Sequence, residues 1–347
     1  MKVLVSMHTS WSTMACSRRA PASPPLSSAC MPNVVPSRKP INSLGSFQNE
    51  MLSLGMPSLQ GMAQQGQPHE VFILFERMQK DRLSPDGVTF TCVLNACSSI
   101  GALDKGKEIH DEIVHRGLLE RNIMLGNALV DMYAKCGMFA KARSVLEELC
   151  IRNVVTWNAL IAGYVQHGQG HEALNCFEQM QNEGFSPDVV IFICLLMACG
   201  STGAVDKGKE IHDKVVSRGL LEKDIMLGTA LIDMYVKCCA LPKAREVLEE
   251  LPVRNVVSWN ALIAGYAQQG QSDEALNCFE CMKSEGFSPD LVTFTCILKA
   301  CGSAGAIDKG KQIHDEIVCR GLLEKDKDIT TSIYQFYIVL LFDASEK

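Results

Sequence analysis

Trp157-Asn-Ala-Leu-Ile-Ala-Gly-Tyr164 is followed 102 residues later by an identical copy, Trp259-Asn-Ala-Leu-Ile-Ala-Gly-Tyr266. A second stretch, Lys105-Gly-Lys-Glu-Ile-His110, returns at the same interval as Lys207–His212 and, with one Glu replaced by Gln, as Lys309–His314. Self-similarity at a fixed period indicates stacked repeats rather than one folded core. We therefore expect function to be spread along the array and not confined to a single pocket.

The charge of the chain limits how it can bind nucleic acid. The 347 residues carry a formal net charge of -6. Residues 1–51 hold five basic residues and one acidic residue, so the remainder has 28 basic and 38 acidic residues. This balance argues against a protein that holds nucleic acid mainly by neutralising phosphates. If nucleic acid is the ligand, local contacts must do the reading.

The sixteen cysteines do not suggest a disulfide framework. Ten of them recur in the 102-residue register and lie inside helical patterns, where thiols act as small apolar fillers. This usage indicates a reducing compartment. These ten are Cys92, Cys97, Cys136, Cys176, Cys194, Cys199, Cys238, Cys278, Cys296 and Cys301.

The first 51 residues differ from the rest in composition. They contain ten serines, several prolines and scattered arginines, with no acidic residue before Glu50. Such a composition is typical of a disordered transit peptide and predicts import into mitochondria, with chloroplasts as the alternative. A disordered leader without a targeting role is the other interpretation. No apolar run in the chain reaches the ~20 residues that a membrane span needs.

Each 102-residue period divides into three units of 35, 36 and 31 residues. Within 154–188, apolar residues from Trp157 to Tyr164 recur at helical spacing, with Thr156 in the expected N-cap position. A glycine-containing turn and a second apolar stripe follow, so the unit is predicted to be a pair of antiparallel helices. Neither helix can bury its apolar face alone, and neighbouring units must therefore stack. The predicted units are 52–86, 87–122, 123–153, 154–188, 189–224, 225–255, 256–290 and 291–326.

These alternating lengths and their motifs resemble the pentatricopeptide repeat family, in particular its plant-type subclass of standard, long and short repeats. The resemblance extends from about Gln60 to Asp326. It implies an all-α fold, a right-handed α-solenoid of antiparallel helical hairpins. The matching motifs are Val155–Asn158 and Ser186–Asp188 in the standard unit, Leu196–Cys199 and Lys207–His212 in the long unit, and Ala230–Tyr235 and Val253–Asn255 in the short unit.

A second repeat family fits the sequence less well, and two segments of the chain differ from the pentatricopeptide repeat pattern. The tetratricopeptide repeat, a peptide-binding solenoid, has a strict 34-residue period that a 31-residue unit does not fit. The first unit has Leu54-Gly-Met-Pro57 where the opening helix signature is expected. Residues 327–347 form an aberrant C-terminal tail without the short-unit signature, which suggests truncation or a changed reading frame. Family members that edit RNA often carry a deaminase-like domain after the array, and we expect this chain to lack one.

Two motifs that look chemical are interpreted as structural. Gly101-Ala-Leu-Asp-Lys-Gly-Lys107 has the glycine and lysine spacing of a phosphate-binding loop, but Glu108 stands where the magnesium-binding Ser or Thr belongs. Cys278-Phe-Glu-Cys281 and His110-Asp-Glu112 echo a zinc deaminase, yet no proline precedes Cys281 and the pattern is not kept between repeats. We therefore predict no enzyme activity, no metal site, no catalytic residues and no cofactor.

The resemblance implies that each repeat reads one base of single-stranded RNA through its fifth and its last residue. Amide and hydroxyl groups suit this role because they match the donor and acceptor edge of an unpaired base. Ile193, in the long unit 189–224, cannot form such a hydrogen bond through its side chain. The predicted base-reading pairs are Asn127 with Asn153, Asn158 with Asp188, Thr229 with Asn255, and Asn260 with Asp290. The long units offer weaker candidates, Thr91 with Asn122, Asp224, and Thr295 with Asp326.

By this code, the readable repeats from 123 to 290 spell 5′-(C/U)-U-n-A-U-3′. The leading hypothesis is a sequence-specific, single-stranded RNA-binding protein that acts in organellar RNA processing or modification, as an adaptor in editing, stability or splicing. It is expected to recruit protein partners, with neither membrane nor DNA involved. The alternatives are a protein–protein interaction solenoid without RNA contact and a truncated, non-functional copy of such a protein.

Overall fold

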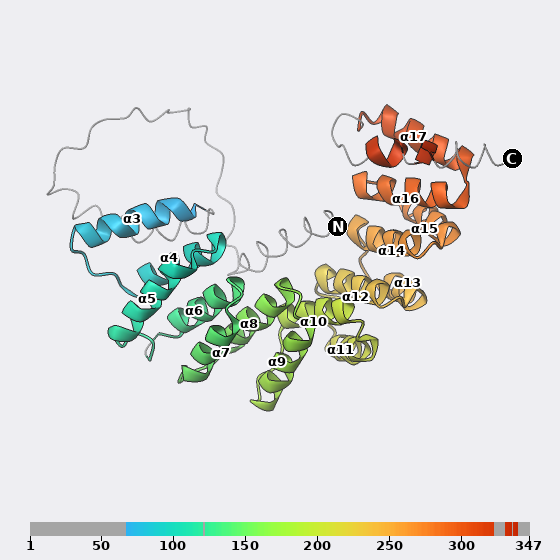
Figure 1. The fold of residues 1–347 in the computed structure, drawn as a ribbon. Helices are drawn as coiled ribbons and strands as arrows, with labels where there is room; N and C mark the ends of the chain where they lie inside the picture. Colours follow the sequence, from blue (N-terminus) through green and yellow to red (C-terminus); the bar gives the residue numbers. More distant parts are fainter. Residues whose placement is uncertain (1–66, 121, 323–329, 335, 339–347) are drawn as a thin grey trace, which may run out of the picture. The chain divides into compact units, whose positions relative to one another are not determined.

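The structure is a computed structural model that describes residues 67–120, 122–322, 330–334 and 336–338. The predicted transit peptide and the altered opening at Leu54–Pro57 lie outside these residues. The chain divides into two compact units, Met1–Gly163 and Tyr164–Lys347, which we describe separately. Every regular element in the described part of each unit is an α-helix (Figure 1), which confirms the predicted all-α class.

The first unit is a stack of helical hairpins. Its first-helix elements α4 and α6 lie side by side, and each packs against the second helix that follows it. The buried side chains of this unit form an apolar core that includes Phe75, Phe90 and Tyr133. The helices are α3 (Pro68–Lys80), α4 (Gly87–Ile100), α5 (Leu103–His115), α6 (Ile123–Lys135), α7 (Phe139–Glu148) and most of α8 (Val154–Gln166).

The second unit repeats this arrangement. The first helices α10, α12, α14 and α16 contact one another in sequence, and the second helices α11, α13, α15 and α17 each pack against the first helix before them. Because the main contacts of these described hairpins are with their neighbours along the chain, the unit is a solenoid. The helices are α9 (Gly170–Asn182), α10 (Val189–Thr202), α11 (Val205–Ser217), α12 (Ile225–Lys237), α13 (Leu241–Glu250), α14 (Val256–Gln268), α15 (Ser272–Ser284), α16 (Leu291–Ala304) and α17 (Ile307–Cys319).

The first helix of each hairpin from α4 onward begins at the first residue of its predicted repeat unit. The residue directly before the helix explains this start. In each case an Asp or Asn directly before the helix accepts a hydrogen bond from a backbone N–H of the first turn, as an N-cap does. Asp290 accepts from the Thr293 amide at 2.9 Å, and Asn153 accepts from the Thr156 amide at 2.9 Å. The expectation that Thr156 is the N-cap is therefore wrong. Thr156 is the third helical residue, and its hydroxyl bonds back to Asn153.

The Lys-Gly-Lys-Glu-Ile-His motif packs the second helix of a long unit against the next first helix. Gly208 of α11 lies where a Cβ would approach the Met234 Sδ atom to 2.6 Å, so a larger residue would force the Met234 side chain to move. The Nδ1 atom of His212 is hydrogen-bonded to the Tyr235 hydroxyl at 3.0 Å. The first unit has the same His110–Tyr133 bond at 2.9 Å. The motif therefore has a packing role at this helix contact.

The start of the C-terminal tail extends the same pattern. Residues 330–334 and 336–338 are helical, and Phe336 is buried against Gly310. The Tyr337 hydroxyl is hydrogen-bonded to His314 Nδ1 at 2.9 Å, the third copy of the His–Tyr pair. Sequence comparison did not show this match, because the surrounding residues differ from the short-unit signature. Among the described residues, no helix combines the length and the hydrophobicity of a membrane span.

Candidate nucleic-acid interface

The predicted reading residues Asn260 and Asp290 lie in direct contact. Asn260 is on α14, and Asp290 caps the neighbouring α16, which brings residues 30 positions apart in sequence together. The amide nitrogen of Asn260 donates to the two carboxylate oxygens of Asp290 at 2.9 and 3.1 Å. Thr293 completes the cluster, because its hydroxyl donates to the amide oxygen of Asn260 at 2.6 Å.

This cluster leaves part of its hydrogen-bonding capacity unused. A primary amide has two N–H donors and two oxygen lone pairs. Thr293 uses one lone pair of Asn260, and the carboxylate of Asp290 engages the amide nitrogen. Asn260 is only 4% exposed, whereas Asp290 is exposed. Asn260 is therefore a buried polar residue, and Asp290 is the solvent-facing member of the pair.

The pair Asn127 and Asn153 in the first unit is linked through a third residue. The Thr156 hydroxyl lies 2.7 Å from the Asn127 amide oxygen and 2.9 Å from the Asn153 amide oxygen. Asn127 is half-buried on α6, and Asn153 precedes α8. The same chemistry thus recurs with a bridging threonine.

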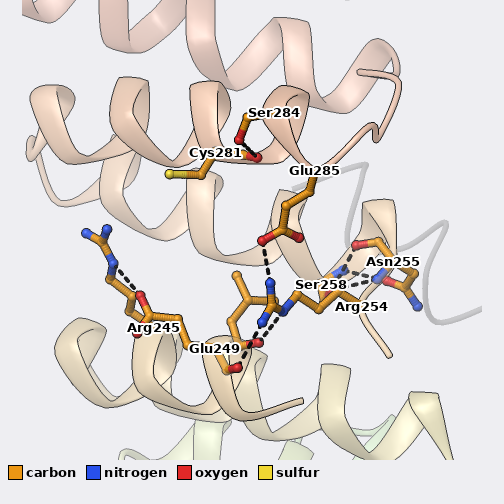
Figure 2. Close-up of polar contacts among 9 residues, drawn as sticks. Arg245, Glu249, Arg254, Asn255, Ser258, Cys281, Ser284 and Glu285 are labelled. Atoms are coloured by element: carbon orange, nitrogen blue, oxygen red, sulfur yellow. Dashed lines mark hydrogen bonds and ion pairs between the residues drawn. The ribbon is translucent and has the colours of Figure 1, made fainter. Parts of the chain in front are cut away.

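Thr229 and Asn255 are each occupied by local bonds. Thr229 is buried on α12, and its hydroxyl donates to the Ile225 carbonyl oxygen at 3.1 Å. Asn255 forms a capping box with Ser258, with the Ser258 amide at 2.7 Å from its side-chain oxygen. Figure 2 shows this box beside Arg254, which bonds the carbonyl oxygens at the end of α13 and pairs with Glu285. These bonds hold the Asn255 loop between α13 and α14.

Asn158 and Asp188 belong to different compact units and are placed separately. Asn158 is half-buried on α8. Asp188 is exposed and caps α10, accepting from the Ile191 amide at 3.0 Å. Burial, reinforced by the charge of Asp188, raises the pKa of the Cys194 thiol to about 12, so this thiol stays neutral next to the carboxylate.

The weaker candidates of the long units engage mainly their own backbone. The hydroxyls of Thr91 and Thr295 each donate to a carbonyl oxygen one turn earlier, both at 2.8 Å. Asn122 and Asp224 cap α6 and α12. Asp326 lies outside the described residues. Because each threonine hydroxyl donates its proton to its own helix backbone, it can only accept a hydrogen bond from another group.

Residues that the sequence interpretation missed stand three positions after the cap. Thr156 and Thr293 bond both a fifth-position amide and the cap residue. The signal was present in the sequence as Asn or Asp followed three residues later by Thr or Ser, a pattern that marks a helix start. What the pattern does not show is the second bond, which crosses to the neighbouring helix.

The chain belongs to the pentatricopeptide repeat family. A PPR repeat family model matches residues 58–99, 152–201 and 254–303, and a PPR repeat model matches residues 88–118, 127–154 and 292–322. The matched segments together cover more than half of the chain. The family seen in the sequence motifs is therefore confirmed.

Similar proteins come from Arabidopsis thaliana. A mitochondrial pentatricopeptide repeat-containing protein is 37% identical over 280 residues, which is 81% of this chain and 27% of that protein. Another, whose name gives no compartment, is 40% identical over 250 residues, 72% of this chain and 34% of its own length. A chloroplastic one is 35% identical over 277 residues, 80% of this chain and 34% of its own length. The chain thus spans about a third or less of each of these relatives.

A solved structure has the same fold. The pentatricopeptide repeat protein PPR10 from maize matches with a TM-score of 0.66 at 22% identity, over 88% of this chain and 47% of that chain. PPR10 was also solved in complex with an 18-nucleotide psaJ RNA element, and this structure matches with a TM-score of 0.67. At this identity the likeness establishes the helical-hairpin fold.

Proposed function

We propose that this chain binds single-stranded RNA in a plant organelle, with each readable repeat contacting one base. The observation that carries the proposal is the Asn260–Asp290 contact, because a sequence code paired these two residues and the fold places them 2.9 Å apart. Membership of the family supports the proposal, as does the RNA complex of PPR10.

The chemistry of the cluster suits uracil. The Watson–Crick edge of uracil presents one N–H donor between two carbonyl acceptors, so a reader must offer an acceptor and a donor side by side. The free lone pair of the Asn260 amide oxygen supplies the acceptor, and the amide nitrogen supplies the donor. Because Asp290 holds that nitrogen, it fixes which way the amide faces. A single orientation of the amide is what distinguishes uracil from cytosine.

The standard, long and short subclass assignment and the processing role belong to the same proposal. We infer that the chain acts as an adaptor that places editing, stability or splicing factors on a transcript and does no chemistry itself. Among its relatives, one is named as mitochondrial and another as chloroplastic, and these names support a location in one of the two organelles. Mitochondria remain our first expectation, because of the acid-poor residues 1–51.

Binding to short RNA oligonucleotides tests the proposal. The intact chain should prefer 5′-CUNAU-3′ over the same RNA with its last base changed to adenine, by about 1–3 kcal/mol, the range of good base contacts. Asn260→Thr combined with Asp290→Asn copies the 225–255 pair and should reverse this preference. Salt dependence should be shallow, because the array is acidic.

The result also separates the alternatives. Equal ranking of the two RNAs by the wild type and by the double variant would refute the one-repeat, one-base reading. RNA mobility that is unchanged in every variant, together with capture of a protein partner, would favour the interaction solenoid. An unstable chain without RNA affinity would favour the non-functional copy.

A further inference from the structure

The long units carry an arginine that reaches back to the loop in front of their first helix. Arg116, Arg218 and Arg320 stand 102 residues apart and occupy the C-cap positions of α5, α11 and α17. In each copy the guanidinium donates to the carbonyl oxygen of a proline that directly precedes the Asp capping the first helix of the same unit. Periodic recurrence of one bond in both compact units indicates a common purpose.

The geometry of the three copies is nearly the same. The distances from the arginine Nη1 atom to the proline carbonyl oxygen are 3.2 Å for Arg116, 3.0 Å for Arg218 and 3.1 Å for Arg320. Arg116 and Arg320 also donate to the serine hydroxyl one residue before the proline, at 3.2 and 3.1 Å. The acceptor prolines are Pro85, Pro187 and Pro289, and all three are buried.

An aromatic ring holds each guanidinium in place. Arg320 lies over Phe294 of α16 with its guanidinium carbon 5.3 Å from the ring centroid. Arg218 lies over Phe192 at 5.3 Å, and Arg116 lies over the corresponding phenylalanine of α4 at 5.4 Å. A planar guanidinium suits this double role, because it stacks on a ring and still donates in its own plane.

The proline that accepts the hydrogen bond from the arginine directly precedes a residue that we propose to read a base. Pro289 immediately precedes Asp290, and Pro187 immediately precedes Asp188. The carboxylate of Asp290 in turn orients the amide of Asn260. A continuous set of contacts therefore runs from Arg320 of the long unit 291–326 to the amide of Asn260 in the standard unit before it.

We propose that these arginines are positioning residues, through which each long unit sets the base preference of the preceding standard unit. The proposal rests on the proposed RNA-reading function and adds a role for the long units. The unit 189–224 carries the same arginine, Arg218, although its own fifth residue, Ile193, cannot hydrogen-bond to a base through its side chain.

Two arginine variants act as controls for each other. Arg320→Ala should reduce discrimination only at the base assigned to repeat 256–290, and Arg218→Ala only at the base assigned to repeat 154–188. The expected loss is about threefold to tenfold in the ratio of Kd values for uracil and cytosine, equivalent to one ordinary hydrogen bond. Lys309→Ala removes a similar charge from α17, breaking an ion pair with Glu280, and should leave both ratios unchanged.

The possible results distinguish failure of the arginine positioning role from failure of the proposed RNA-reading function. If wild-type protein shows no preference at either base, the reading function fails. If the preferences exist and Arg320→Ala retains its uracil ratio, the positioning role is refuted. Loss of both ratios in one variant, or the same loss with Lys309→Ala, would mean that the residue only holds the array together. A double variant with Asp290→Ala should lose no more than Asp290→Ala alone, since Arg320 acts through Asp290.

Discussion

Replacing Asp290 with alanine should cost more local stability than the same change at Asp86. Both residues cap a first helix, and both accept from the N–H of the third helical residue, at 2.9 and 2.8 Å. They differ in one partner. Asp290 also binds the buried Asn260 amide, whereas the residue at the equivalent position for Asp86 is Met56, which has no side-chain amide.

The expected difference follows from these bonds. Loss of the cap alone costs about 1 kcal/mol, within a range of about 0.5–2 kcal/mol, and this is the full expectation for Asp86→Ala. Asp290→Ala loses the cap and also leaves the nitrogen of a buried amide without its partner, which adds about 1–3 kcal/mol. Water can reach the site through the space of the exposed Asp290, so the added cost should fall in the lower half of that range. Asp290→Asn keeps the cap and should cost little.

Native-state hydrogen exchange is the suitable assay, because repeat arrays do not unfold in one step and a single unfolding midpoint mixes all repeats. Exchange of the α14 and α16 amides should accelerate more in Asp290→Ala than exchange of the α4 amides in Asp86→Ala. Equal acceleration in the two variants would show that the Asn260–Asp290 bond contributes nothing, and the geometric basis of the proposed reading would fall with it.

Three further predictions concern the repeat scaffold. Cys239 has a left-handed backbone conformation, φ 59°, where the preceding period has Gly137, so Cys239→Gly should raise stability by about 1 kcal/mol and Gly137→Cys should lower it in thermal unfolding. Burial, together with the nearby charge of Lys243, lowers the pKa of His212 in the folded protein. The unfolded chain therefore binds a proton more readily, and the free energy of unfolding should fall as the pH drops below about 6.5, the ordinary histidine pKa, through the lower pKa of the folded state. His212→Gln should reduce this pH dependence in unfolding measured as a function of pH. Iodoacetamide should label the exposed Cys239 before Cys199, whose pKa burial raises to about 12, and equal rates would contradict the packing.

Much of the fold could be predicted from the sequence because its determinants are local. Helical periodicity, capping residues and turn glycines act within a few positions, and repetition at a fixed interval implies stacking. The frames placed Val256 and Leu291 at the start of helices, where the structure has them. The pairing of Asn260 with Asp290 was also accessible, but through family resemblance rather than through spacing.

Other features depended on the packing of neighbouring helices, which spacing alone does not reveal. The distance between adjacent hairpins determines three of these features. They are the burial of Asn260, its hydrogen bond to Thr293, and the packing of Phe336 against Gly310. Arg320 shows the limit most clearly. Its recurrence was visible in the sequence, but its partner lies 31 residues earlier, across the hairpin. Only the folded hairpin brings such a pair within 3.1 Å, because the path of the chain through two helices and a turn sets that distance.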